Sequence, residues 1–494
     1  MGLVFAFAAQ FSPSAGGWPL IVAATVGAYM AMNIGANDVA NNVGPSVGSG
    51  AITLGGAILI AGIFEAAGAL IAGGEVVSTI KNGIIDAGQL ADPDEFVWLM
   101  MAALLAGALW LNIATAVGAP VSTTHSIVGG VLGAGLAAGG TGIADWDQVL
   151  VIVISWIISP LLGGVIAAAF LYLIKRTVTY QKTVMAAASR MVPLLLTLMA
   201  WSFSTYLVLK GLKQIWKVDF LTAILIGAVP AAITYAVTRP RILRRARELP
   251  NDKAHVNDLF TLSLIFAAAL LSFAHGANDV ANAVGPLAAI NEAIVSHGVA
   301  TKAAIPVWVM LIGALGLSVG LALYGPRLIR TVGSEITELD KTRAFCIALA
   351  AAITVILASQ LGLPVSSTHI AVGGVFGVGF LREYLKTNYS RLIHEIENHH
   401  QGADRQVVED FLKAFEGADI KEKGAMLQQL RRKMNATTLS RKERKRLKRL
   451  YKKDLVKRTL LLKVIAAWVI TVPASAGLAA ILFFALRGFS IGQG

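Results

Sequence analysis

The residues best suited to binding chemistry stand in a short polar block, Gly35–Pro45, which reads GANDVANNVGP between long apolar runs. On a helix, Asn37 and Asn41 lie four residues apart, and Asp38 shares a face with Asn41 and Asn42. We expect the helix to break at the glycine and Gly-Pro positions that bound the block. A carboxylate, amide oxygens and carbonyls freed by the break make a hard-oxygen site suited to a small cation such as Na⁺.

The same block occurs again as GANDVANAVGP over Gly276–Pro286. An aspartate within a membrane segment is costly and indicates a functional site by default. Interhelical hydrogen bonding is the structural alternative, and a near-identical second copy makes it the weaker explanation. Glu65 lies within the apolar segment 51–74 and has no acidic counterpart in the second half; we interpret it as a cation-coupling residue, with a structural polar pair as the alternative. The predicted cation ligands are Asn37, Asp38, Asn41, Glu65, Asn278, Asp279 and Asn282.

A second duplicated motif reads PVSTTH at Pro120–His125 and PVSSTH at Pro364–His369. Each copy follows an apolar helix and precedes a glycine-rich stretch that is short for a span, which predicts a half-helix beginning inside the membrane. Proline suits the first turn of a helix, and the free N–H groups and hydroxyls there would form an anion site. Helix capping alone is the structural alternative and uses the same geometry. The predicted anion ligands are Ser122, Thr123, Thr124, Ser366, Ser367 and Thr368.

A histidine closes each copy of this motif. His125 and His369 could titrate or could stay neutral and orient the loop, and the sequence does not decide between these roles. The spacing of Ser122 and His125 raises a serine hydrolase as an alternative. No acid stands beside them to orient the histidine, and a duplicated active site would be unusual. We therefore do not expect an enzyme.

The composition places these motifs in a membrane. The chain of 494 residues is 56% hydrophobic and only 14% charged, whereas soluble proteins carry about 25% charged residues. Its long apolar runs are sufficient to span a bilayer as helices, which satisfy their own backbone hydrogen bonds. Cys346 is the only cysteine, so neither an intrachain disulfide nor a cysteine metal site can form, and we expect no cofactor.

The order of the duplicated motifs divides the chain into two repeats. A weaker third pair, Trp156–Pro160 and Trp468–Pro473, is spaced further apart because a polar segment precedes the last helix. We predict an all-α polytopic membrane protein with an inverted-topology repeat, broken helices, half-helix hairpins and about 12 spanning helices. The predicted boundaries are 18–175 for the first repeat, 176–256 for two linking spans and a cytoplasmic loop, 257–381 for the second repeat, 382–459 for a charged insertion and 460–486 for the last helix.

Basic residues in the loops set the predicted orientation. Loops 175–190 and 239–257 are rich in Lys and Arg and are expected to be cytoplasmic, which places both termini outside. The insertion 382–459 has leucines at helical spacing, and we predict a cytoplasmic helical hairpin. Most of the net charge of +13 comes from the run 431–458. Such a run before a span is typical of an anchor facing anionic lipid, so we expect no nucleic-acid partner.

Both duplicated motifs resemble those of the inorganic phosphate transporter (PiT) family, over residues 18–381 and 460–486. The resemblance implies Na⁺- or H⁺-coupled uptake of phosphate across the cytoplasmic (inner) membrane, a twelve-helix inverted-repeat fold and a homodimer. It also implies that the Asn/Asp blocks bind the ions and that the Ser/Thr half-helices hold phosphate. Family members often read Glu-Leu-Ala where this chain has Ala348-Leu349-Ala350. The missing carboxylate bears on the ion stoichiometry or on the identity of the coupling ion.

Two other transport functions stay open from the sequence. Some relatives of this family resemble sulfate carriers, so a symporter for sulfate or another oxyanion is the first alternative. An anion channel is an alternative of another class, because it needs no coupling ion. The paired carboxylates at Asp38 and Asp279 argue against a channel, since a pure anion pore has no use for them.

Overall fold

The structure is a computed structural model that describes Gly2 and residues 17–90, 92–116, 121–211, 218–296, 305–335, 340–397 and 458–491. Within these ranges the chain is helical, and one isolated bridge joins Ile85 to Ala144. The first predicted repeat contains α2 (Trp18–Asn37), α3 (Val39–Gly48), α4 (Leu54–Ala72), α5 (Gly74–Asn82), α6 (Pro93–Ala116), α7 (Thr123–Gly139) and α8 (Trp146–Ile174). The linking region contains α9 (Val184–Gly211), α10 (Phe220–Glu248) and α11 (Lys253–Leu259). The second repeat contains α12 (Thr261–Asp279), α13 (Ala281–Ser296), α14 (Val307–Glu335), α15 (Lys341–Gln360), α16 (Ser367–Glu397) and α20 (Arg458–Ile491).

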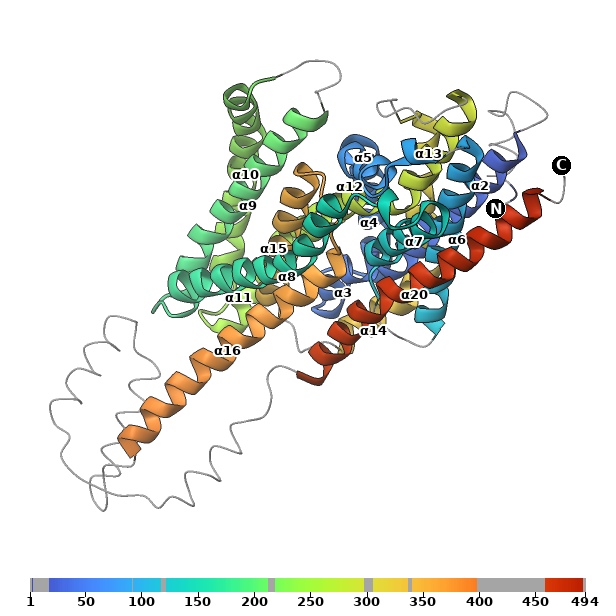
Figure 1. The fold of residues 1–494 in the computed structure, drawn as a ribbon. Coiled ribbons are helices and arrows are strands. Elements are labelled where there is room, and N and C mark those ends of the chain that lie inside the picture. The colour runs from blue at the N-terminus through green and yellow to red at the C-terminus, as the bar shows by residue number, and fades with distance from the viewer. Residues whose placement is uncertain are drawn as a thin grey trace.

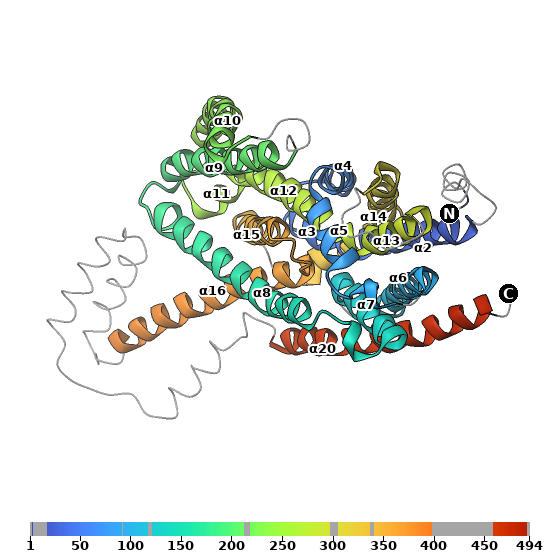
Figure 2. The same cartoon turned by 45° about the horizontal axis from the view of Figure 1, so that its top comes forward.

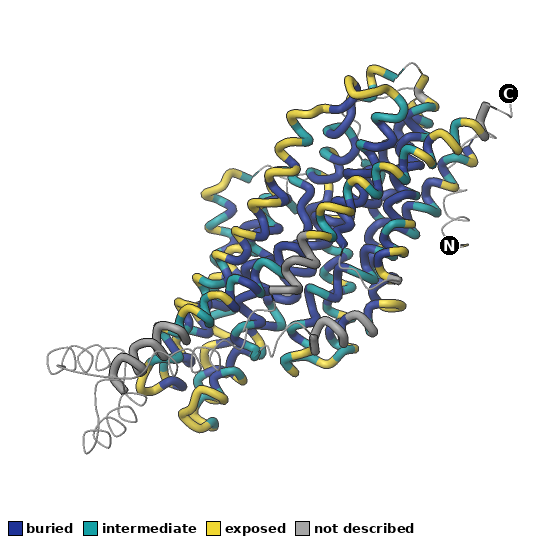
Figure 3. Tube along the Cα trace, turned by 60° about the horizontal axis from the view of Figure 1, so that its bottom comes forward, coloured by how far each residue is buried: buried dark blue, intermediate teal, exposed yellow. Residues whose placement is uncertain are grey.

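The helices have the lengths and hydropathy of membrane spans. Ten candidate spans occur among the described residues, with α2 and α3 counted as one and α12 and α13 as another. The outer surface is apolar as well: Leu221, Leu225, Val229 and Ile233 follow one face of α10 at four-residue spacing, and each is more than half exposed. Figure 3 shows that buried backbone fills the centre and that exposed positions lie on the periphery. The prediction of an all-α polytopic membrane protein is confirmed.

The two helices that begin at the Ser/Thr motifs, called the half-helices, pack against the last helix of the opposite repeat. Of these, α7 has 17 residues, as expected for a half-helix, whereas α16 has 31. The short helix α7 lies along α20, and α16 lies along α8; both pairs are visible in Figures 1 and 2. The third motif pair joins each of these helices to the last helix of its own repeat: the His125 ring of α7 packs on Trp156 of α8 at 3.8 Å, and the His369 ring of α16 packs on Trp468 of α20 at 4.0 Å. The equivalent histidines and tryptophans of the two halves therefore make equivalent contacts.

Glycines let the broken helices approach their neighbours closely. A side chain at Gly276 in α12 would meet the backbone of Glu65 in α4, and a side chain at Gly35 in α2 would meet the backbone of Leu317 in α14. Since Gly35 and Gly276 are equivalent positions of the duplicated block, Leu317 is the structural counterpart of Glu65. The α2–α14 contact therefore repeats the α4–α12 contact with an apolar residue in place of the acid.

The helix interruptions lie elsewhere than predicted. The first block breaks at Asp38, between α2 and α3, and the second breaks at Val280, between α12 and α13. Gly35 and Gly276 lie inside helices, and Pro45 lies inside α3. The glycines serve close helix packing, so the expectation that they and the Gly-Pro pairs would end the helices is wrong.

The charged insertion begins without a break. Helix α16 continues from the second repeat to Glu397, past the predicted boundary at 381. The remainder of the predicted hairpin, with Leu427 and Leu450, lies outside the described residues, as does the basic run 431–457. The last helix, α20, begins at Arg458 and ends at Ile491, somewhat beyond the predicted 460–486.

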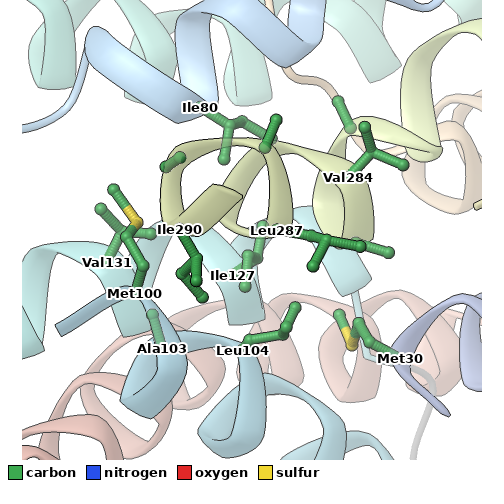
Figure 4. Packing of buried hydrophobic residues seen from close by; sticks show 14 of the residues in the cluster. Met30, Ile80, Met100, Ala103, Leu104, Ile127, Val131, Val284, Leu287 and Ile290 are labelled. Atoms are coloured by element: carbon green, nitrogen blue, oxygen red, sulfur yellow. The ribbon is translucent and has the colours of Figure 1, made fainter. Parts of the chain in front are cut away.

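The largest apolar cluster surrounds α13. Ile80 of α5, Leu104 of α6 and Ile127 of α7 contribute to it, together with Val284 and Leu287 of α13 itself. Figure 4 shows α13 in the middle of these side chains. A helix of the second repeat is thereby enclosed by helices of the first, which joins the two repeats through a common core.

Candidate functional site

The two half-helices begin at one place and lead away from it in opposite directions (Figure 2). Ser122 caps α7 by accepting from the His125 N–H at 3.2 Å, and Ser366 accepts from the His369 N–H at 3.3 Å. Thr124 Oγ1 donates to the Val365 carbonyl at 2.9 Å, which ties the start of α7 to the loop before α16. The positive ends of two helix dipoles therefore face the same small region.

Asp38 joins these two helix starts. Its Oδ2 accepts from Thr123 Oγ1 at 2.8 Å, and its Oδ1 accepts from Thr368 Oγ1 at 3.2 Å. Asp279 occupies the equivalent position of the second block, and its Oδ2 accepts from Ser367 Oγ at 2.9 Å. Both carboxylates are at least 98% buried. The structure thus brings the predicted cation ligands and the predicted anion ligands into direct contact.

The asparagines of the two blocks also contact the hydroxyl groups. Asn282 Nδ2 donates to Thr123 Oγ1 at 3.2 Å and to Thr124 Oγ1 at 3.1 Å. Asn41 Nδ2 makes the equivalent bond to Thr368 Oγ1 at 2.9 Å. Each asparagine contacts the half-helix of the opposite repeat, so the two halves of the site depend on each other.

Asn278 makes its hydrogen bonds to a loop. Its Nδ2 donates to Ser359 Oγ and to the Leu363 carbonyl, and its Oδ1 accepts from the Val365 N–H. These bonds hold the segment that leads into α16. Its equivalent, Asn37, is half-buried at the end of α2. The cation-binding roles of Asn37 and Asn278 stay predictions, and positioning the loop is the role that the contacts of Asn278 support.

A chain of ionisable side chains extends from Asp279 to Glu65. His275 Nδ1 lies 2.7 Å from Glu65 Oε2, and His275 Nε2 lies 2.7 Å from Asp279 Oδ2, outside hydrogen-bonding geometry. Asn42 Nδ2 donates to Glu65 Oε1 at 2.9 Å. All of these side chains are buried. Glu65 therefore lies next to the second Asn/Asp block, although the sequence places it in the first repeat.

Sequence reasoning missed His275. The signal was present, because the two copies of the block differ just before the glycine that both contain, with Ile34 in the first and His275 in the second. Leu317 likewise replaces Glu65 in the equivalent contact. The polar pair is thus confined to one half of a site whose other contacts are duplicated.

The arrangement fits a small cation. Asp38, His275 and Asp279 each offer one ligand atom, and these atoms lie within 4.8 Å of one another. Asp279 Oδ1 and Asn282 Oδ1 are buried oxygens that have no hydrogen-bond partner in the structure. Buried polar atoms are rarely left unpaired, and unpaired oxygens beside two carboxylates are suitable ligands for a hard cation.

The ring nitrogens of His125 and His369 make no hydrogen bonds in the structure. The two rings lie 4.8 Å apart, and both residues are at least 98% buried. They pack directly behind the helix starts and so support them sterically. Ala348, where the family resemblance implies an acid, is buried in an apolar cluster that also contains Cys346 and Phe345.

A helical bundle with ten candidate membrane spans around a buried cluster of carboxylates and hydroxyls is the architecture of a membrane transporter. The sequence pattern described as "Phosphate transporter family" matches residues 34–479. This chain belongs to the phosphate transporter family. The transporter family and fold also confirm that the protein is not an enzyme.

Similar proteins cover 75% to 95% of this chain. Two relatives carry the name "Putative phosphate permease": one from Helicobacter pylori (strain J99) is 54% identical over 477 residues, covering 94% of this chain and 90% of that one. The other, from Pyrococcus horikoshii, is 40% identical over 378 residues, covering 75% and 91%. A solved structure named "The sodium-dependent phosphate transporter" is 32% identical with a TM-score of 0.77, covering 95% of this chain and 99% of that one.

Proposed function

We propose that this member of the phosphate transporter family is a secondary active symporter that carries inorganic phosphate together with Na⁺ across the cytoplasmic membrane. One observation carries the proposal: the Asp38 carboxylate accepts hydrogen bonds from the starts of both half-helices, through Thr123 and Thr368. The hydroxyl protons that could bind phosphate are therefore the same protons that now bind the candidate cation ligand, Asp38. The name of the similar solved structure agrees with sodium as the coupling ion.

Sharing of hydroxyl protons supplies a mechanism for coupling. A hydroxyl group has a single proton to donate. Thr123 and Thr368 direct theirs to Asp38, and Ser367 directs its own to Asp279. A phosphate at the helix starts would draw these protons to its own oxygens, and the buried carboxylates would then need another source of positive charge. A bound Na⁺ provides it, so anion binding and cation binding favour each other.

Coupling to protons is the alternative that a particular observation favours. His275 lies between Glu65 and Asp279, at 2.7 Å from each, and occupies a position where the other half of the site has Ile34. Phosphate uptake into proteoliposomes with choline replacing Na⁺ at fixed pH decides between the ions. We expect uptake to collapse in choline. Full uptake in choline, combined with a strong response to an imposed pH gradient, would establish proton coupling instead.

Substrate choice follows from the same contacts. Phosphate near neutral pH is partly protonated and can donate to an acceptor such as Asp38, Asp279 or the unpaired Asn282 Oδ1. Sulfate carries no proton at this pH and would leave that acceptor unpaired, at a cost of about 1–3 kcal/mol. Arsenate should therefore compete with phosphate in proteoliposomes and sulfate should not. Accumulation of phosphate against its gradient separates this symporter from an anion channel.

The membrane orientation and the assembly are part of the proposal. We place the loops 175–190 and 239–257 in the cytoplasm and both termini outside, because the basic residues concentrate in those loops. Labelling of single introduced cysteines by an impermeant reagent in whole cells tests this orientation. We also propose a homodimer in the bilayer, as the family resemblance implies; the mass of the purified protein by light scattering tests it.

A further inference from the structure

The helices α5 and α13 form a closed seam on one side of the site. Both end at the same side of the molecule (Figure 1), and they pack against each other. Ile80 of α5 covers Gly285 of α13, where a side chain would lie 2.7 Å from Ile80 Cγ2. Figure 4 shows Ile80 directed at α13. Asn282, a residue of the candidate site, lies on α13 just before this seam.

A buried ion pair lies on the far side of the seam. Lys81 Nζ contacts Glu292 Oε2, and both side chains are more than 90% buried. Ten residues separate Asn282 from Glu292 on α13, which is about 15 Å along a helix. The pair lines a cavity of about 230 Å³ together with Asn291, Val295 and other residues at the end of α13. The ion pair thus stands between this cavity and the candidate site.

The end of α5 is held by the second repeat at another point. Thr79 Oγ1 donates to the Gly362 carbonyl at 2.7 Å, in the loop that leads into α16. The ion pair has no equivalent on the opposite side of the molecule, because the corresponding positions of the repeats are Gly333 for Lys81 and Ala51 for Glu292. Symmetry of the fold therefore does not explain the ion pair. A function that is needed on one side of the molecule only would explain it.

We propose that Lys81 and Glu292 form the gate on this side of the transporter, closing the path between the cavity and the phosphate site. The gate rests on the proposed symport, and it opens when α5 and α13 separate and water reaches both charges. A buried ion pair is stable while its partners stay together, and removing one partner leaves an uncompensated buried charge. Either single substitution should therefore favour the hydrated, open seam.

The test measures access to the seam and needs neither Na⁺ nor phosphate. Cys346→Ala removes the only cysteine, and Val77→Cys then places a reporter one helical turn deeper than Lys81 on the same face of α5. Val77 is fully buried in the closed seam. Val295→Cys, on the cavity wall and 59% exposed, reports a position that is accessible throughout. An impermeant thiol reagent is added to oriented proteoliposomes, and labelling rates are compared.

We expect Lys81→Gln and Glu292→Gln each to raise labelling of Val77→Cys by about tenfold, equivalent to about 1.4 kcal/mol in the opening equilibrium. The exchange of charges, Lys81→Glu with Glu292→Lys, should restore protection. As a control, Lys210→Gln breaks the partly exposed ion pair between Lys210 of α9 and Glu75, which lies on α5 like Lys81. This variant should leave labelling unchanged. Unaltered Val295→Cys labelling and monodisperse protein show that each variant is folded.

Two results would overturn the gate. One is unchanged Val77→Cys labelling in both single variants, and the other is a charge exchange that labels as fast as they do. Failure of the proposed symport looks different, because it would show as phosphate uptake independent of Na⁺ in the protein with the intact ion pair. The labelling experiment therefore tests the gate separately.

Discussion

Replacing Asp38 by asparagine is the perturbation whose effect the structure defines most fully. The side chain keeps its size, but a carboxamide has one acceptor oxygen where the carboxylate has two. It can satisfy only one of the two hydroxyls, Thr123 or Thr368, and it carries no charge for a cation. An interaction with a charged group contributes about 1.5–3 kcal/mol, which converts to a loss of about 10-fold to 150-fold in Na⁺ affinity.

The assay is the Na⁺ dependence of radioactive phosphate uptake in proteoliposomes that contain matched amounts of Asp38→Asn and wild-type protein. We expect the half-saturating Na⁺ concentration to move out of the accessible range, so that coupled uptake is lost. Thermal unfolding without Na⁺ should be nearly unchanged, and the stabilisation that Na⁺ gives to the wild type should disappear. Uptake within about twofold of wild type, a change of only about 0.4 kcal/mol, would refute the ion-ligand role of Asp38.

Three further predictions follow from other parts of the structure. Thr124→Val and Thr368→Val should each raise the KM for phosphate, and the double variant should show less than the sum of the two effects because both hydroxyls act on one ligand; additive effects would indicate separate sites. Gly276→Ala places a methyl group against the Glu65 backbone and should lower stability by about 1–3 kcal/mol, measured as a lower Tm. Gly477→Ala, with nothing within 4 Å of the added carbon, is the matched control and should not lower Tm. Replacing 398–450 by a short linker should leave the KM for phosphate unchanged, since the site contacts lie in the two repeats; a large rise would show that this segment takes part in binding.

Much of the site could be predicted because both of its motifs occur twice in the sequence. Asp38 and Asp279 were expected to bind a cation, and Thr123, Ser367 and Thr368 were expected to bind an anion. In the structure Asp38 accepts hydrogen bonds from Thr123 and Thr368, and Asp279 accepts one from Ser367. Hydroxyls at a helix start and carboxylates in apolar segments have few other uses in a membrane, so their residue types alone carried strong information.

Other features depend on contacts between distant segments, which a local pattern does not contain. His275 meets Glu65 across 210 residues of sequence, and nothing in the sequence near either residue points to the other. The helix breaks were misplaced for a related reason. Gly35 and Gly276 resemble helix breakers locally, but the neighbouring helices α14 and α4 require a residue without a side chain at those points. Comparing the two copies position by position would have drawn attention to His275.

The Lys81–Glu292 pair shows the same limit. Lys81 lies near the end of a short helix in the first repeat, Glu292 lies in a second helix beyond the second polar block, and neither has a counterpart in the other repeat. Only the packing of α5 on α13 brings them together. Asymmetry between otherwise duplicated halves therefore marks the positions where the two sides of the transporter differ.

Coupling through Asp38 is the central claim, and the dependence of phosphate binding on Na⁺ in the purified wild-type protein tests it most directly. Calorimetric titration with phosphate is carried out at saturating Na⁺ and again in choline at the same pH and ionic strength. Linkage requires that Na⁺ and phosphate strengthen each other by the same factor, and coupling energies of about 1–3 kcal/mol correspond to about 5-fold to 150-fold. We predict a phosphate Kd that is tighter in Na⁺ by a factor in this range, and an equal effect of phosphate on the Kd for Na⁺. Equal phosphate affinity in Na⁺ and in choline would contradict the account.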